Sequence, residues 1–280
     1  MEVSVKMKNK KGVVIVGGNG VVGVAMKKMF PEALCYDVIG NSCTKEEANT
    51  CELAIVCVPT PMKIIEGEEF SQCDTSIVES CVAWIETDYI LIKSTVEPQT
   101  TDNLIKKYNK KIGFSPEYIG MSSYQITPWK FMDKNDPRLH DFLIIGAEPA
   151  TAERITEIFV NKLGFEKKYH IVSAVEAELI KYLENTHGAM EVSFYNQYYE
   201  LCKALGASWI KVREGHILDN RVNPAYTAVF VDNRGFFGRC FGKDSNAIVH
   251  KAEKLNVDLS ILKSAIRKNR EIRPKNEGEC

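Results

Sequence analysis

The sequence has 280 residues, enough for one large domain or two ordinary ones, each able to bury a hydrophobic core. Apolar residues make up 45% of the chain and charged residues 26%, as in ordinary globular proteins. Lysine and arginine number 36 against 37 acidic residues, so no net field exists to attract nucleic acid or anionic lipid. We therefore expect a small-molecule partner, no nucleic acid and no membrane.

The cysteines and the start of the chain indicate a reducing compartment. The nine cysteines are odd in number, scattered and never spaced CxxC, which favours reduced thiols in a cytoplasmic protein over a disulfide framework or a metal site. The six from Cys35 to Cys81 are predicted to be buried small hydrophobes. The first twelve residues lack the apolar core of a signal peptide, and no apolar run approaches the roughly 20 residues that span a bilayer.

The first 172 residues alternate between short apolar runs and helical stretches. Strands are predicted at 12–16, 33–37, 53–58, 89–93, 111–114 and 143–145, and helices at 21–30, 74–84, 101–108 and 149–163, the last ended by a left-handed Gly164. This alternation predicts an α/β domain with a largely parallel sheet covered by helices.

The pattern changes near residue 173. Ser173 and Glu176 form a predicted capping box, and a helix of about 33 residues, about 50 Å long, then runs to a stop at Gly206. This length suits a spine between a domain of residues 1–172 and a mainly helical domain of residues 173–280, with a further helix at 259–269. The side chains of Phe194, Tyr195, Tyr198 and Tyr199 pack either against a second subunit or within the core of one chain.

A glycine motif follows the first strand. Gly18, Asn19, Gly20, Val21, Val22 and Gly23 fit GxGxxG between a strand and a helix. Asp37 ends the next strand, where a carboxylate binds ribose hydroxyls and repels a 2′-phosphate. The motif predicts a Rossmann-type domain that binds NAD; the alternative is a tight turn with an incidental aspartate.

Lys181 and Asn185 stand four residues apart in the long helix, so both side chains share a face and can meet one substrate oxygen. The alternative is a solvated surface lysine. His187 lies off that face and is expected to be structural.

A segment around Cys240 carries a family resemblance. Gly238-Arg-Cys240-Phe-Gly-Lys243-Asp244 resembles the GGxCFPKD segment of the UDP-glucose/GDP-mannose dehydrogenases. Five further blocks occur in the family's order: Val58 to Pro61, Ser94 to Val96, Ser115 to Tyr118, Ala177 to Asn185, and Asp219 to Arg221. The sequence departs from the family at Phe237 and Gly242, at Glu97 in STVEP, and near Met121, where a second glutamate is expected. The family also continues into a second Rossmann-like domain, which we expect this chain to lack.

The resemblance implies a two-step oxidation of a sugar nucleotide, UDP-glucose to UDP-glucuronate, with two hydrides passed to two NAD⁺. In such enzymes a cysteine adds to the intermediate aldehyde, and the thiohemiacetal is oxidised to a thioester that water hydrolyses. By position that cysteine is Cys240; the alternative is an inert buried thiol, as most cysteines are.

The resemblance also assigns roles to the residues around this cysteine. Lys181 and Asn185 hold the oxyanion, Asp244 and Thr95 manage the proton, and Glu117 activates the hydrolytic water. Cofactor contacts are assigned to Val58, Pro59, Thr60 and Thr95, and substrate contacts to Glu117, Tyr118, Lys181, Asn185, Arg221, Gly238 and Lys243. Lys243 meets substrate phosphate or stabilises the loop, and Arg221 reaches a neighbouring subunit, which implies a homodimer through the long helix.

Three hypotheses remain open. The first is an active nucleotide-sugar dehydrogenase. The second is a β-hydroxyacid-type enzyme that makes a single oxidation with Lys181. The third is a non-catalytic homologue that binds NAD or a sugar nucleotide.

Overall fold

The fold is taken from a computed structural model that describes residues 10–40, 43–119, 135–237 and 240–273. The chain forms two compact units. The first contains described residues 10–60, 75–119 and 135–179, and the second contains residues 61–74 and 180–273. The boundary therefore lies inside a long helix, and the second unit takes a short segment from the first third of the chain. Among the described residues, no helix is both long and apolar enough to cross a membrane.

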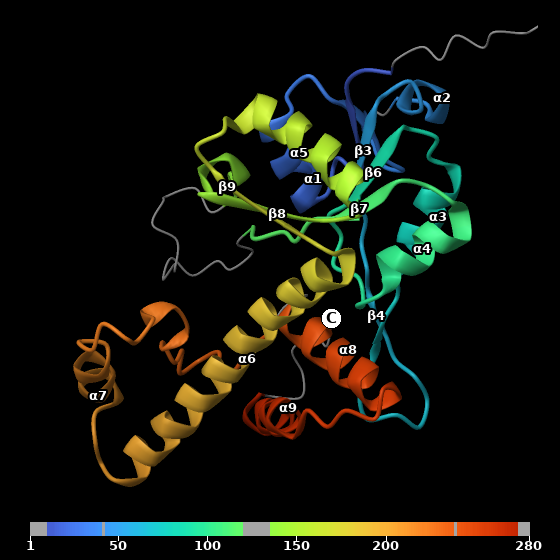
Figure 1. Ribbon diagram of the computed structural model, residues 1–280. Helices are drawn as coiled ribbons and strands as arrows, with labels where there is room; N and C mark the ends of the chain where they lie inside the picture. The colour runs from blue at the N-terminus through green and yellow to red at the C-terminus, as the bar shows by residue number, and fades with distance from the viewer. Residues whose placement is uncertain (1–9, 41–42, 120–134, 238–239, 274–280) are drawn as a thin grey trace, which may run out of the picture. The chain divides into compact units, whose positions relative to one another are not determined.

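The first unit is built on a seven-stranded sheet (Figure 1). Its strand order is β2-β1-β3-β6-β7-β8-β9, and every neighbouring pair is parallel except β7 with β8. The strands are β1 (Val13–Val16), β2 (Leu34–Tyr36), β3 (Leu53–Val56), β6 (Tyr89–Ile92), β7 (Ile112–Phe114), β8 (Phe142–Gly146) and β9 (Lys168–Val172). β2 lies on one side of β1, and the next strand, β3, lies on the other side of β1. The order of the strands therefore reverses between β1 and β3, and in such sheets ligands bind at this switch point.

Helices cover both faces of this sheet. One apolar cluster joins alternate residues of β1 and β3 to helices α1 (Val21–Met29) and α5 (Pro149–Leu163), with Phe30 and Phe159 edge to face at 5.2 Å. Helices α3 (Ser76–Trp84) and α4 (Thr100–Tyr108) lie together on the opposite side (Figure 1). This division follows from right-handed crossovers that run in opposite directions from the centre of the sheet.

The α/β architecture and the elements predicted in this unit are confirmed within a few residues at each end. The structure adds β9 and the short helix α2 (Lys45–Ala48), which the sequence patterns missed. β9 has a mostly exposed or half-buried surface, so no apolar run marks it. Gly164 does end α5 with a positive φ of 81°, but its ψ of 167° is extended and not left-handed helical.

The second unit is mainly helical. It contains α6 (Ala174–Ala204) from Ile180 onward, α7 (Trp209–His216), α8 (Phe241–Lys254), α9 (Ser260–Ile272) and the hairpin of β4 (Met62–Lys63) and β5 (Gln72–Cys73). Phe70 of the hairpin is buried with Ala189, Val249 and Ile266, and so joins the helices in one core. Short single-turn helices, η1 (Pro137–Leu139) and η2 (Pro224–Tyr226), lie in the connections of the first and second unit respectively.

The predicted ends of the long helix are confirmed. The Ser173 amide donates to Glu176 Oε2 at 2.7 Å, and the Glu176 amide donates to Ser173 Oγ at 3.4 Å, which completes the capping box. Gly206 follows the last turn with φ of 67°. The helix has 31 residues.

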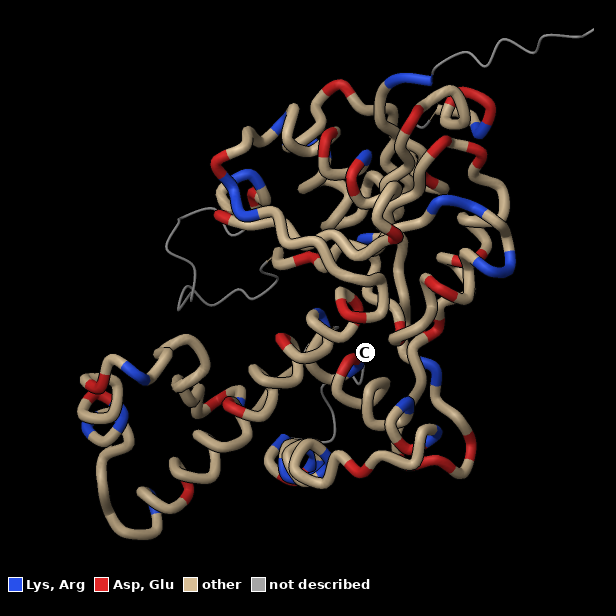
Figure 2. The backbone as a smooth tube through the Cα atoms, viewed as in Figure 1, with Lys and Arg blue, Asp and Glu red and all other residues tan. Residues whose placement is uncertain are grey.

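The expected burial of the six early cysteines is partly wrong. Cys51, Cys57, Cys73 and Cys81 are buried, whereas Cys35 and Cys43 are half-buried. The reason is that Cys35 lies on β2, an edge strand that leaves one side of the sheet partly open. Acidic and basic positions are interspersed along the chain (Figure 2).

Candidate active site

The glycine turn of the first unit has the geometry of a dinucleotide cradle. Gly17 has φ of 81°, and a Cβ on Gly23 would lie 2.2 Å from the Gly17 carbonyl oxygen, so helix α1 packs on the turn only because Gly23 has no side chain. Gly20 precedes α1 without a side-chain cap, which leaves backbone donors of the first turn for an anion. The residues present therefore fit a pyrophosphate.

Asp37 is held close to this turn. Its Oδ2 accepts from the Asn19 amide at 2.8 Å, and its Oδ1 accepts from the Ile39 amide at 3.1 Å. Both donors come from exposed backbone, so the carboxylate is at the surface, where ribose hydroxyls would meet it. This arrangement matches the predicted selection of NAD by an acidic residue.

The other predicted cofactor residues follow neighbouring strands. Val58, Pro59 and Thr60 follow β3, and Thr95 follows β6, so both segments share the carboxyl edge of the sheet with the glycine turn. The Ser94 hydroxyl donates to the Val58 carbonyl at 2.7 Å and ties the two segments together. The structure thus brings all the predicted cofactor residues to one edge of one sheet.

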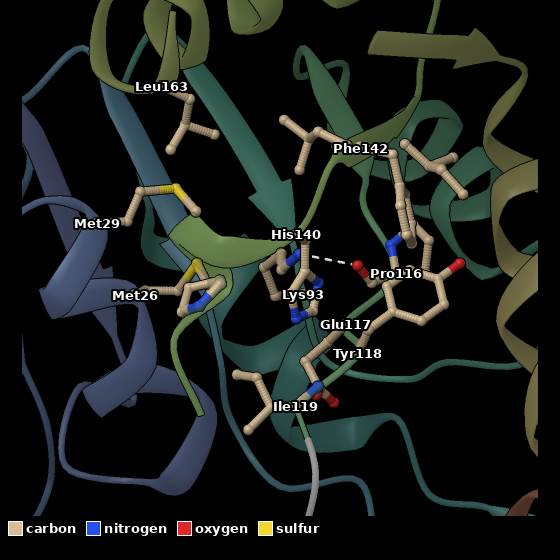
Figure 3. A pocket seen from close by; sticks show the side chains of 13 residues that line it. Met26, Met29, Lys93, Pro116, Glu117, Tyr118, Ile119, His140, Phe142 and Leu163 are labelled. Atoms are coloured by element: carbon tan, nitrogen blue, oxygen red, sulfur yellow. Dashed lines mark hydrogen bonds between the residues drawn. The ribbon is translucent and has the colours of Figure 1, made fainter. Parts of the chain in front are cut away.

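Glu117 and Tyr118 lie beside a pocket in the same unit (Figure 3). Lys93, which is only 5% exposed, donates through Nζ to Ser115 Oγ at 3.2 Å and to the Pro116 carbonyl at 2.9 Å. The Glu117 carboxylate accepts from the Ile119 amide. Lys93 therefore holds the backbone that carries Glu117, a role that no sequence pattern indicated.

The same pocket contains an aromatic group. The Tyr118 ring contacts Phe142 edge to face at 5.0 Å and lies 6.3 Å from His140. Burial and the charges of Lys93 and Lys167 lower the pKa of His140. The imidazole is therefore neutral at physiological pH.

In the second unit, the other predicted catalytic residues form a chain of hydrogen bonds. Lys181 Nζ donates to Asn185 Oδ1 at 3.3 Å, and Asn185 Nδ2 donates to Asp244 Oδ2 at 2.5 Å. Asp244 Oδ1 accepts from Lys243 Nζ at 2.5 Å. Lys181, Asn185, Lys243 and Asp244 are all less than a tenth exposed, so these hydrogen bonds are largely shielded from water.

Cys240 lies next to this network. It is the residue before α8, its carbonyl accepts from the Asp244 amide at 2.9 Å, and its side chain is half-buried. Cys240 is thus more exposed than the buried cysteines of the chain, such as Cys202. Gly238 lies outside the described residues.

Two predicted substrate residues have intramolecular partners. Lys243 pairs with Asp244, and its Nζ is 3.8 Å from Cys73 Sγ. Burial is the largest single influence and acts to lower the pKa of Lys243, but the charge and hydrogen bond of Asp244, together with Cys73 and Cys240, outweigh it and the pKa is raised. Arg221 is 90% exposed and forms a bidentate pair with Asp219 two residues away.

One contact of the network was missed. Glu184, whose side chain is 35% exposed, accepts from Lys181 Nζ at 2.8 Å. The signal was present, since positions three residues apart on a helix face each other. His187, as expected, lies off the network, with a side chain 63% exposed and 3.6 Å from Glu191.

Fold and side chains together define a dinucleotide-binding α/β unit followed by a helical unit with a buried Lys–Asn–Asp network. The chain belongs to the UDP-glucose/GDP-mannose dehydrogenase family: residues 14–127 match its NAD binding domain and residues 175–271 its central domain.

Relatives differ in the substrate that they are named for. A UDP-glucose 6-dehydrogenase of Rickettsia prowazekii is 29% identical over 82% of this chain and 51% of its own length. A UDP-N-acetyl-D-mannosamine dehydrogenase of Methanococcus maripaludis is 29% identical over 75% of this chain and 47% of its own length. The chain thus spans about half the length of the curated relatives it matches.

Solved structures share the fold. A UDP-glucose dehydrogenase from Pyrobaculum islandicum superposes with a TM-score of 0.74 at 22% identity, covering 95% of this chain and 69% of the other. UDP-D-ManNAc dehydrogenase from Pyrococcus horikoshii gives 0.73 at 18% identity, covering 92% and 68%.

Proposed function

We propose that this protein oxidises the primary alcohol of a nucleotide sugar to the carboxylate in two NAD-dependent steps, with UDP-glucose as the first substrate to test. The observation that carries the proposal is the buried chain Lys181–Asn185–Asp244, with Cys240 one helical turn before Asp244. Bound NAD would accept a hydride from the substrate carbon in each oxidation.

In the first step, the residues of the network hold the alcohol oxygen as it loses its proton. The Lys181 ammonium is a fixed cation beside the Asn185 amide, and together they stabilise negative charge on that oxygen. Asp244, tied to Asn185 at 2.5 Å, keeps the amide oriented and serves as the proton's route outward. The family resemblance assigns Thr95 to the same proton path.

In the second step, the Cys240 thiolate adds to the aldehyde carbon. A carbon–sulfur bond forms, the carbonyl oxygen becomes an oxyanion beside Lys181, and the thiohemiacetal carbon can then lose its hydride to give a thioester. Water activated by Glu117 cleaves the thioester and releases the carboxylate and the thiol. Glu117 follows β7 and is held through Lys93, which fixes the backbone before it.

The substrate contacts remain part of the proposal. Tyr118, Gly238 and Arg221 are assigned to the sugar nucleotide, Arg221 from a neighbouring subunit. For Lys243 the observed pair with Asp244 favours the loop-stabilising role over direct phosphate binding. Because relatives are named for UDP-glucose and for UDP-N-acetyl-D-mannosamine, a substrate panel should contain both sugar nucleotides.

The decisive experiment measures NADH produced per molecule of product with a panel of sugar nucleotides. Two NADH per carboxylate are expected, with loss of carboxylate formation in Cys240→Ser and retained turnover in the matched buried-thiol control Cys202→Ser. Mass spectrometry should find a substrate adduct on Cys240 when hydrolysis is slowed.

Two other outcomes would favour the alternatives. One NADH per product with full activity in Cys240→Ser supports a single oxidation of the β-hydroxyacid type. Binding of NAD without turnover of any sugar nucleotide supports a non-catalytic homologue.

We also propose a homodimer through α6. Phe194, Tyr198, Leu201 and Leu205 recur every three or four residues and are 51%, 47%, 52% and 73% exposed, so they form one apolar stripe. Tyr195 and Tyr199 have partners within the second unit, Tyr195 with Trp209 and His216 and Tyr199 with Arg234. The stripe, and not the whole aromatic group, is the candidate interface.

A further inference from the structure

We propose that Cys35 and Cys43 are a modification site, at which a peroxide forms a disulfide that weakens dinucleotide binding. The effect on binding rests on the proposed NAD function, whereas formation of the disulfide does not. Both thiols belong to the first unit and flank Asp37 in the sequence.

The backbone already holds the two cysteines at bonding range. The Cys43 amide donates to the Cys35 carbonyl at 2.8 Å, so Cys43 pairs with the edge strand β2. A single N–H···O=C bond of this length keeps the backbones of the two residues adjacent. Disulfides join Cα atoms about 4.4–6.8 Å apart, and we infer that rotation of the side chains brings the two sulfurs together.

These two thiols are also the accessible ones. In the described part of the first unit, Cys51, Cys57 and Cys81 are buried, while Cys35 and Cys43 are half-buried on the surface beside β2. Burial, with contributions from Glu47 and from Cys35 itself, raises the pKa of Cys43. Because only the thiolate reacts, the raised pKa slows the reaction of Cys43 at neutral pH, and we expect the disulfide to form faster at alkaline pH.

The Cys35 sulfur is part of the packing beneath the glycine turn. A Cβ on Gly18 would lie 2.3 Å from Cys35 Sγ, so the sulfur fills the space that the missing side chain leaves. Cys35 Sγ also donates to the side-chain Oδ1 of Asn19 at 3.9 Å, and the backbone N–H of the same residue donates to Asp37. Turning the sulfur toward Cys43 removes this support from the turn and constrains the backbone around Asp37.

The chemistry balances with hydrogen peroxide as the oxidant. One thiolate attacks peroxide, the O–O bond breaks, and the sulfenic acid and one water form. The second thiol displaces hydroxide from the sulfenic sulfur, so the S–S bond forms and a second water is released. Two thiols are oxidised by two electrons in total, and one peroxide is reduced to two waters.

The test treats the full chain with hydrogen peroxide and maps its peptides by mass spectrometry without reduction. We expect a Cys35–Cys43 peptide 2 Da lighter than the reduced form, as two hydrogens are lost. The dissociation constant for NAD, measured by calorimetry in a Cys240→Ser background, should rise at least fivefold and recover after dithiothreitol. Cys43→Ser should bind NAD with the affinity of the parent and keep that affinity after peroxide treatment. Cys51→Ser should lose NAD affinity after peroxide to the same extent as the parent.

The outcomes separate this inference from the proposed function. Absence of the linked peptide, or pairing of Cys43 with Cys51, overturns the disulfide. A Cys35–Cys43 disulfide with unchanged NAD affinity overturns the control of binding. If the reduced protein binds no NAD, the proposed function and the control of binding both fail, while the peptide map still decides the disulfide.

Discussion

At the scale of single residues, burying the Asp244 carboxylate costs free energy that its hydrogen-bond partners must offset. Its carboxylate is 1% exposed and has Lys243 on one oxygen and Asn185 on the other. A buried charge is tolerated only when it is paired and hydrogen-bonded, so both partners contribute to the stability of this arrangement. Through Asp244, the position of the Asn185 side chain also depends on Lys243.

Lys243→Met should lower the stability of the protein by about 3–5 kcal/mol, since it leaves a buried carboxylate without its cation. The measurement is the urea midpoint followed by circular dichroism. Lys254→Met is the matched control, because that lysine is 58% exposed in its pair with Glu68 and should change the midpoint little. Equal losses in the two variants would contradict the prediction.

At the scale of elements, Glu178 connects α6 to the start of α4 within the first unit. Its carboxylate accepts from the Gln99 amide at 2.6 Å, the Thr101 amide at 2.8 Å and the Thr101 hydroxyl at 2.7 Å. Burial nevertheless raises the pKa of Glu178 to about 7, and Asp102 adds to the rise. The side chain thus fixes the first turns of α6, one turn before Lys181.

Glu178 should make stability depend on pH. Because its pKa is higher in the folded chain, the folded state holds a proton that the unfolded chain releases above its ordinary pKa near 4.5. Protonated Glu178 therefore contributes up to about 3 kcal/mol to the free energy of unfolding. This contribution is fully present below pH 4.5 and is lost as the pH rises through about 7. Glu178→Gln cannot titrate there.

The measurement is the difference in unfolding free energy between wild type and Glu178→Gln from pH 4 to pH 8. Wild type should lose stability relative to the variant as the pH rises. A difference that stays constant, or that grows in favour of wild type toward pH 8, would contradict the prediction. It would show that the three hydrogen bonds from Gln99 and Thr101 lower the pKa of Glu178 at least as much as burial raises it.

At the scale of the whole molecule, the stripe of Phe194, Tyr198, Leu201 and Leu205 along α6 and just after it is an exposed apolar surface. Leu201→Glu with Leu205→Glu should convert a dimer to a monomer, because two charges would have to be buried in an apolar contact. Sedimentation velocity at the same concentration checks this. Leu255→Glu, on a leucine 57% exposed at the end of α8, should leave the dimer intact. A monomeric wild type would exclude the interface.

The sequence alone determined the features that depend on neighbours along the chain. The glycine turn, the capping box at Ser173 and the i, i+4 pair of Lys181 with Asn185 are set by local geometry, and each is confirmed. The family resemblance added Cys240 and Asp244, which no local rule connects to Lys181. The pair of Lys181 with Glu184 was available from spacing and was overlooked.

Tertiary structure decided what depends on distant parts of the chain. Asn185 and Asp244 stand 59 residues apart and meet because α8 packs beside α6 in one core. Residues 61–74 lie in the sequence between two strands of the first unit, β3 and β6. They belong to the second unit because Phe70 packs against apolar side chains there. Cys35 is half-buried because β2 lies at an edge of the sheet, and strand order is set by packing that no single segment encodes.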